Sequence, residues 1–201
     1  LPQNRAAART GAQRSQVLLK NDGATLPLDP AKSTALIGPL GDDRHDMLGP
    51  WWGRGDDNDA VSLFEGMQKQ GAVTYTPGCT MSHNDLYDPE NECGSQAGFP
   101  AAVAASQAAD QIVIAVGETR EMSGEAESRS MLDLPGQQEE LIKQVRDANP
   151  GKPLAVVLFN GRPLVLKDVL PNAPAILEAW FPGVEAGNAV ADVIYGKVNP
   201  G

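Results

Sequence analysis

The sequence predicts an α/β fold, a three-layer α/β/α sandwich built around a mostly parallel sheet. Short apolar runs alternate along the chain with segments of helical periodicity, which is the pattern of consecutive strand and helix units. The runs at 111–116 and 154–159 are apolar on both faces, as expected of strands that helices cover on both sides. The 21 glycines and 16 prolines supply the turn signals between these segments.

The first half of the chain begins with a helical pattern at 5–19, in which arginines mostly face solvent. A short apolar run at 33–37, ended by a Gly-Pro step, predicts a buried strand. Apolar residues at helical spacing predict a helix at 61–70, and a second strand is expected at 73–75. An alanine-rich segment predicts a helix at 101–109.

The second half repeats the alternation. The run at 111–116 is apolar on both faces and is expected to be a central strand. The segment 136–149 is amphipathic, with leucine, isoleucine and valine on one face, and predicts a helix. Further apolar runs predict strands at 154–159 and 175–179, and a last helix is expected at 185–195.

The loops that follow the strands are expected to carry the functional site, because ligands bind beyond the carboxyl ends of the strands in such sheets. These loops are 38–59, 77–100, 117–135 and 160–165.

Charge and composition exclude several classes of partner. The chain has 201 residues, with 26 acidic and 16 basic side chains and a formal net charge of −10, which suits one domain of ordinary size. The negative balance, without a basic cluster, argues against nucleic acid or an anionic membrane as partner. No apolar run approaches the roughly 18 residues of a membrane span. A nucleotide-binding domain is disfavoured because Gly53-Arg54-Gly55 lacks the third glycine of the dinucleotide fingerprint.

The two ends suggest a piece of a longer protein. The chain begins at Leu1 without a signal segment and ends in the turn signal Asn199-Pro200-Gly201. Residues 1–20 are expected to form a lead-in helix or linker after a missing N-terminal domain. Residues 21–201 are expected to form the sandwich domain, truncated at its C-terminal end.

Cysteines and histidines are few. Cys79 and Cys93 lie 14 residues apart in an expected loop, where a disulfide and two free thiols are both open. His45 and His83 have no partner at metal-ligand spacing and are expected to be solvated loop residues. We therefore expect neither a metal nor a cofactor.

The acidic loop is the most distinctive segment. Residues 117–129 follow the most apolar strand and contain four glutamates: Glu118, Glu121, Glu125 and Glu127. Carboxylates on such a loop suit general acid/base chemistry or the binding of hydroxyl groups. A solvated acidic loop without chemistry is the alternative.

This segment resembles part of the C-terminal α/β sandwich domain of glycoside hydrolase family 3, the β-glucosidase family, a flavodoxin-like domain. Further segments agree with the family in order and spacing, and the likeness spans about residues 15 to 201. They are residues 17–28, Ala35-Leu36-Ile37-Gly38-Pro39, Leu132-Asp133-Leu134-Pro135-Gly136-Gln137-Gln138, Asn160-Gly161-Arg162-Pro163, Ala179-Trp180-Phe181-Pro182-Gly183, Glu185-Ala186-Gly187 and Gly196-Lys197-Val198-Asn199-Pro200. Bacterial periplasmic members look most similar.

The resemblance implies a retaining β-glucosidase that removes terminal β-D-glucosyl residues with two carboxylates. The nucleophile would be an Asp on an N-terminal (β/α)8 barrel, which this chain lacks. The Ser123-Gly124-Glu125 step resembles the acid/base position, so Glu125 is expected to protonate the leaving oxygen and then deprotonate water. Glu121 and Glu118 are second choices.

Several secondary expectations accompany this assignment. Arg120 and Arg129 are expected to fix the acidic loop by ion pairs. Trp51 and Trp52 either stack on a sugar ring or pack against the edge of the sheet. Trp180 is expected in the core or at a domain interface.

The resemblance also implies partners and a location. The partners would be the barrel domain of the same protein and a β-glucoside or oligosaccharide substrate, and a second copy of the protein is left open. The protein would be periplasmic or secreted, and the chain alone would be inactive. The alternative is a non-catalytic α/β module that binds sugar or stabilises a partner.

Overall fold

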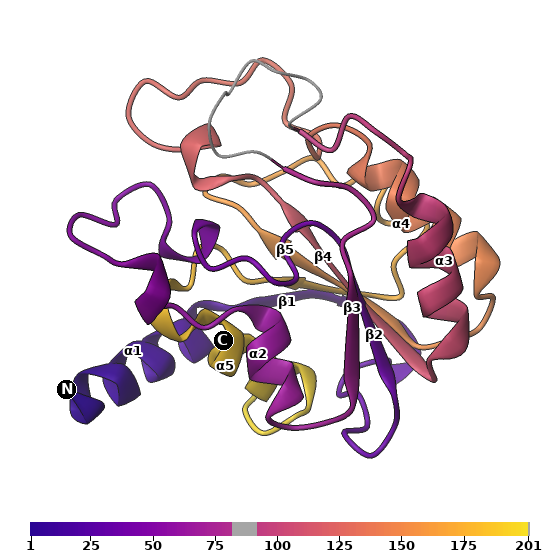
Figure 1. The fold of residues 1–201 in the computed structure, drawn as a ribbon, viewed down its shortest axis with the longest axis horizontal. Helices are drawn as coiled ribbons and strands as arrows, with labels where there is room; N and C mark the ends of the chain where they lie inside the picture. The colour runs from indigo at the N-terminus through magenta and orange to yellow at the C-terminus, as the bar shows by residue number, and fades with distance from the viewer. Residues whose placement is uncertain (82–91, 201) are drawn as a thin grey trace.

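The computed structural model describes residues 1–81 and 92–200, which form a sheet of order β1-β6-β5-β4-β2-β3 (Figure 1). The strands are β1 (Val17–Asn21), β2 (Thr34–Ile37), β3 (Val73–Thr76), β4 (Gln111–Gly117), β5 (Leu154–Phe159) and β6 (Ala175–Glu178). Neighbouring strands from β6 to β3 run parallel, and β1 pairs antiparallel with β6. The mostly parallel sheet that the sequence predicts is therefore confirmed.

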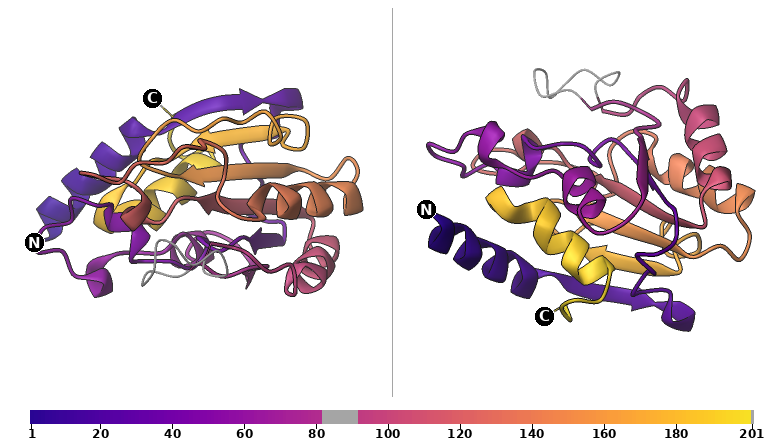
Figure 2. Two further views of the ribbon diagram at one scale, coloured as in Figure 1. Left: turned by 90° about the horizontal axis from the view of Figure 1, so that it is seen from above. Right: turned by 60° about the horizontal axis from the view of Figure 1, so that its bottom comes forward.

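Helices cover both faces of this sheet. They are α1 (Pro2–Ser15), α2 (Leu63–Gln68), α3 (Phe99–Ala108), α4 (Gln138–Ala148) and α5 (Ala186–Ile194). Alternate residues of β4 point to opposite sides, so that Val113 packs with α2 and α5 while Ile112 packs with α3 and α4. Helix α1 lies along α5, outside it (Figure 2). The three layers are thus confirmed as well.

The expected helix at 5–19 is wrong in its last third. Helix α1 ends at Ser15, and Val17–Asn21 is instead the strand β1 at the edge of the sheet. Leu18 faces the core while Val17 and Leu19 are exposed, which is the alternation of a strand rather than a helical face. Its partner β6 comes from the far end of the chain, so local periodicity could not reveal the pairing.

Helices α2 and α5 approach each other closely at two glycines. A Cβ atom added to Gly66 would lie 2.0 Å from the carbonyl oxygen of Gly187. A Cβ added to Gly187 would lie 1.8 Å from the carbonyl oxygen of Ser62, the residue that caps α2 together with Glu65. The crossing therefore depends on the absence of both side chains.

Helix α1 is held to α5 by buried charge. Asp192 of α5 is 2 % exposed and forms an ion pair with Arg9 at 2.6 Å. Its carboxylate also accepts hydrogen bonds from Gln13 and Gln70. This paired carboxylate lies between the helices on one face of the sheet.

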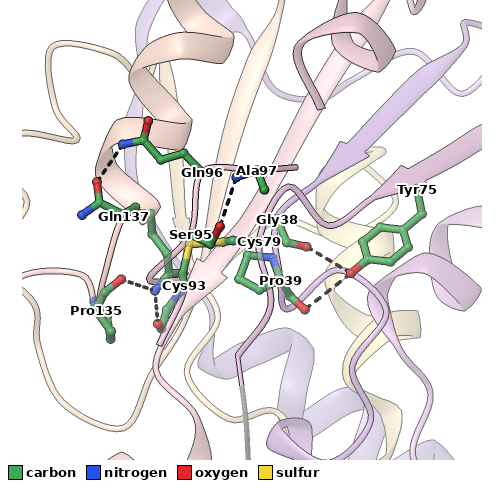
Figure 3. Close-up of a disulfide and its surroundings, with 12 residues drawn as sticks. Gly38, Pro39, Tyr75, Cys79, Cys93, Ser95, Gln96, Ala97, Pro135 and Gln137 are labelled. Carbon is green, nitrogen blue, oxygen red and sulfur yellow. Dashed lines mark hydrogen bonds between the residues drawn. A yellow bond between two sulfur atoms is a disulfide. The ribbon is translucent and has the colours of Figure 1, made fainter. Parts of the chain in front are cut away.

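Cys79 and Cys93 form a disulfide, with their Cα atoms 5.0 Å apart (Figure 3). The sulfurs pack in the apolar core between the sheet and helices α3 and α4. The carbonyl oxygen of Cys93 accepts a hydrogen bond from the backbone of Gln137 at 3.0 Å, which ties this segment to the start of α4. Of the two open alternatives, the structure contains the bonded one.

No helix in the described ranges has the length and apolar character needed to cross a bilayer.

Candidate functional site at the carboxyl edge of the sheet

The loops that follow β2 and β4 enclose a cavity of about 300 Å³ at the carboxyl edge of the sheet. Its lining residues are Pro50, Trp51, Trp52, Arg120, Glu121, Ser123, Gly124, Glu125 and Glu127. A neighbouring cavity of about 370 Å³ adds the turn Asn160-Gly161 and the half-buried Trp180. Three of the four expected loops thus meet at one place, and much of the fourth, 77–100, lies outside the described residues.

The two adjacent tryptophans are exposed at this cavity. Trp51 is 74 % exposed and Trp52 is 44 % exposed. The guanidinium carbon of Arg120 lies 4.6 Å from the centre of the Trp52 ring, a cation–π contact that fixes the orientation of that indole. Trp51 therefore presents an exposed apolar face at the cavity, whereas the ring of Trp52 is held in place by Arg120.

Glu125 lies at the exposed tip of the acidic loop. The flanking residues Gly124 and Ala126 both have positive φ, of 126° and 67°, which turns the chain sharply on each side of it. Within the described ranges no side chain forms a hydrogen bond or an ion pair with the Glu125 carboxylate. This carboxylate is therefore free to meet a molecule that enters the cavity.

Glu121 belongs instead to a network of charged groups. His45 contacts Asp57 through Nδ1 at 2.8 Å and Glu121 through Nε2 at 2.7 Å. Arg120 reaches both carboxylates, at 3.2 Å for Asp57 and 3.1 Å for Glu121. Burial alone would raise the pKa of Glu121, but hydrogen bonds and charge from His45 and Arg120 outweigh it and lower the pKa.

The expectation of a solvated His45 is wrong, because two carboxylates from different loops hold its ring. The other histidine, His83, lies outside the described residues. His45, Asp46 and Glu121 have ligand atoms within 4.8 Å of one another and are the residues in the described ranges that could hold a metal ion. Both ring nitrogens of His45 already contact carboxylates, and Arg120 forms ion pairs with the same two carboxylates.

Glu118 lies below the acidic loop and is fully buried. Arg129 and Arg162 contact its Oε1 atom at 2.8 and 3.1 Å, and the Ser123 hydroxyl donates to Oε2 at 3.1 Å. The expected ion pairs of Arg120 and Arg129 are therefore present. Arg162, which comes from the loop after β5, was not expected in this role.

Glu178 was not expected at this edge, although it ends the buried strand β6. It is 4 % exposed and accepts a hydrogen bond from the backbone of Trp180 at 3.2 Å. Burial raises the pKa of Glu178 to about 7, and the negative charge of Glu118 adds to the rise. A carboxyl group that ends an otherwise apolar strand is the sequence signal that could have revealed it.

This raised pKa predicts how the stability of Glu178→Gln, relative to wild type, depends on pH. Because the folded protein holds the Glu178 proton to a higher pH than the unfolded chain, wild-type stability falls as the pH rises from 4.5, the ordinary pKa of a glutamate, to about 7. Glutamine removes that loss, so the stability of the variant relative to wild type should rise by about 1–3 kcal/mol from pH 4 to pH 8. Urea unfolding at the two pH values measures it.

Glu140→Gln on helix α4 is the control for the loss of a carboxyl group. If Glu178→Gln and wild type differ by the same free energy of unfolding at both pH values, Glu178 does not titrate in this range.

Comparisons with known proteins agree with this architecture. Residues 16–201 match the model of the glycosyl hydrolase family 3 C-terminal domain. The chain is 40% identical to a periplasmic beta-glucosidase of Salmonella typhimurium, over 98% of this chain and 27% of the relative. It is 38% identical to a beta-xylosidase of Formosa agariphila, over 94% of this chain and 26% of the relative.

A solved structure agrees as well. The beta-glucosidase from Listeria innocua in complex with glucose superposes with a TM-score of 0.85 at 35% identity, over 98% of this chain and 26% of that one. The chain thus spans about a quarter of the length of the relatives it matches.

Proposed function

This chain belongs to the glycosyl hydrolase family 3 C-terminal domain family, and we propose that it supplies the catalytic acid/base, Glu125, to the active site of a retaining β-glycosidase. One observation carries the proposal: an exposed carboxylate without a protein partner in the described ranges stands at a cavity beside two exposed indoles. An acid/base must reach both the glycosidic oxygen and a water molecule, and such a position allows both.

The other two candidates are less suited to proton transfer. Glu118 is fully buried and paired with two arginines, so a substrate cannot reach it. Glu121 has a lowered pKa and is held by His45 and Arg120. A general acid needs a proton near the working pH, and the lowered pKa of Glu121 makes its carboxylate less able to hold one.

In the proposed reaction Glu125 acts twice. It first donates its proton to the leaving oxygen while a nucleophilic carboxylate attacks the anomeric carbon, and it then removes a proton from the water that cleaves the glycosyl-enzyme. Retention requires the two carboxyl groups to lie about 5–5.5 Å apart. We propose that the nucleophile comes from an N-terminal (β/α)8 barrel, in the part of the relatives that this chain does not cover.

For the substrate we propose a terminal β-D-glucosyl unit. The similarity to a beta-glucosidase of Salmonella typhimurium and to the Listeria innocua structure with glucose supports this choice. The similarity to a beta-xylosidase of Formosa agariphila makes xylosides the substrates to compare. The disulfide suits an oxidising compartment, and we propose a periplasmic or secreted protein.

We propose that Trp51 stacks on the sugar or aglycone. Trp51→Ala should then raise KM for a disaccharide by roughly 2- to 12-fold, since one stacking face is worth about 0.5–1.5 kcal/mol, with little change in the free energy of unfolding. Steady-state kinetics of the complete protein and thermal unfolding measure the two effects. An unchanged KM would exclude a sugar contact, and Leu170→Ala, which removes another exposed apolar side chain, is the control.

The proposed function is tested by comparing the complete protein with the 201-residue chain on aryl β-glucosides and aryl β-xylosides. We expect turnover by the complete protein only, with β-glucose as the first product in an NMR time course. Turnover by the isolated chain would show that it contains its own nucleophile. A complete protein that binds sugar but hydrolyses neither substrate would support the non-catalytic alternative.

A further inference from the structure

We propose that the buried carboxylate of Glu118 positions Glu125 by anchoring both ends of the loop segment between Ser123 and Arg129. This inference rests on the proposed function of Glu125. Glu118 itself does not touch the substrate, because it is fully buried below the loop. It is therefore a positioning residue.

Each oxygen of the Glu118 carboxylate holds one end of the segment. The Ser123 hydroxyl, two residues before Glu125, donates to Oε2 at 3.1 Å. Arg129, four residues after Glu125, donates from Nη1 to Oε1 at 2.8 Å. Both ends of the tip that carries Glu125 are thus bound to one buried carboxylate, that of Glu118 at the end of β4.

Arg162, from the turn after β5, adds a second set of contacts that anchors this segment. Its Nε atom forms an ion pair with Glu118 at 3.1 Å, and its Nη2 atom donates to the carbonyl oxygens of Met122 and of Glu127, the latter at 3.1 Å. These carbonyls flank Glu125 on either side. The guanidinium therefore joins the two flanks of the tip, and the charge of Glu118 holds the guanidinium.

Close packing under the tip leaves little room for another arrangement. A Cβ added to Gly161 would lie 2.6 Å from the Ser123 hydroxyl oxygen, so the turn after β5 is in contact with the start of the segment. The tip itself has positive φ at Gly124 and Ala126 and no side-chain partner for Glu125 in the described ranges. Its position is consequently set from its ends.

Loss of the Glu118 charge should leave the Glu125 carboxyl group intact but shift its position. A displacement of about 1 Å in a catalytic group costs up to about 100-fold in rate. We expect Glu118→Gln in the complete protein to lower kcat/KM for methyl β-glucoside by roughly 10- to 100-fold. For 2,4-dinitrophenyl β-glucoside, which needs no protonation, we expect a change of less than about threefold.

The double variant Glu118→Gln/Glu125→Gln separates positioning from an independent effect. If Glu118 acts through Glu125, the double variant is no slower on methyl β-glucoside than Glu125→Gln alone. If the loss in kcat/KM of the double variant equals the product of the two single losses, the proposal is overturned. Hydrogen exchange gives a readout besides activity: amides of 122–129 should exchange faster in Glu118→Gln than in wild type.

Asp192→Asn is the matched control, since it removes another buried carboxylate that forms an ion pair, between α1 and α5. It should change neither the leaving-group dependence nor the exchange of 122–129. If Glu118→Gln does not fold, Arg129→Gln removes the contact between Arg129 and Glu118, and the same results are expected of it.

Glu125→Gln tests the proposed function, and Glu118→Gln tests the positioning role. A Glu125→Gln variant with wild-type kinetics would refute the proposed function and with it the positioning role. An impaired Glu125→Gln beside a Glu118→Gln with wild-type kinetics would refute the positioning role alone.

Discussion

Glu125→Gln in the complete protein is expected to lower kcat/KM for methyl β-glucoside by about 10²–10⁴-fold, because methoxide is a poor leaving group that must be protonated as it departs. For 2,4-dinitrophenyl β-glucoside, whose leaving group needs no proton, kcat/KM should stay within about threefold of wild type. In contrast, kcat for this activated substrate should fall, because water must then attack the glycosyl-enzyme without a general base.

Added azide distinguishes this role further. Azide attacks without losing a proton, so it should restore kcat of Glu125→Gln on the activated substrate and yield a β-glycosyl azide. Glu127→Gln removes the same charge from the same cavity and is the comparison variant. Equal losses on both substrates in Glu125→Gln, or a similar leaving-group dependence in Glu127→Gln, would contradict the assignment.

Gly66→Ala is expected to lower the free energy of unfolding by about 3 kcal/mol. The added methyl group would lie 2.0 Å from the Gly187 carbonyl oxygen, and backbone at a helix crossing cannot move aside as a flexible side chain can. Helices α2 and α5 must therefore separate and lose apolar contacts. Urea unfolding of the chain, followed by circular dichroism, measures the change.

Gly11→Ala is the matched control for this substitution. Gly11 lies within α1, and a Cβ there would meet no atom within 4 Å. Alanine in an open helical position should raise the free energy of unfolding by about 0.5–1 kcal/mol. Unfolding midpoints that shift alike in the two variants would show that the helix crossing tolerates the extra group.

The buried strands were the part of the fold most accessible from sequence. The run predicted at 154–159 is β5 (Leu154–Phe159), because a strand covered on both faces must be apolar at every position and its composition alone reveals it. Strand β1 was missed because its pairing with β6 is a contact between the two ends of the chain. Its three consecutive apolar residues fit a helix equally well.

The site was accessible only in part for a similar reason. The acidic loop could be recognised because it follows β4 directly, and Glu125 could be singled out by the resemblance of its neighbours. The burial of Glu118 depends on Arg129 and on Arg162 from another loop, and His45 is held by two loops. Such contacts follow from tertiary packing, which no local pattern encodes.

The strand order has a consequence for how this site can change. From β2 the chain moves outward to β3, then returns across β2 to form β4 and continues in the opposite direction to β5 and β6. The winding of the sheet thus reverses between β2 and β4, and the segments leaving these strands lead to α2 and α4, which lie on opposite faces. A crevice at such a reversal is a property of the topology. Substitutions in 41–59 and 118–134 can therefore retune what enters it while the strands beneath remain as they are.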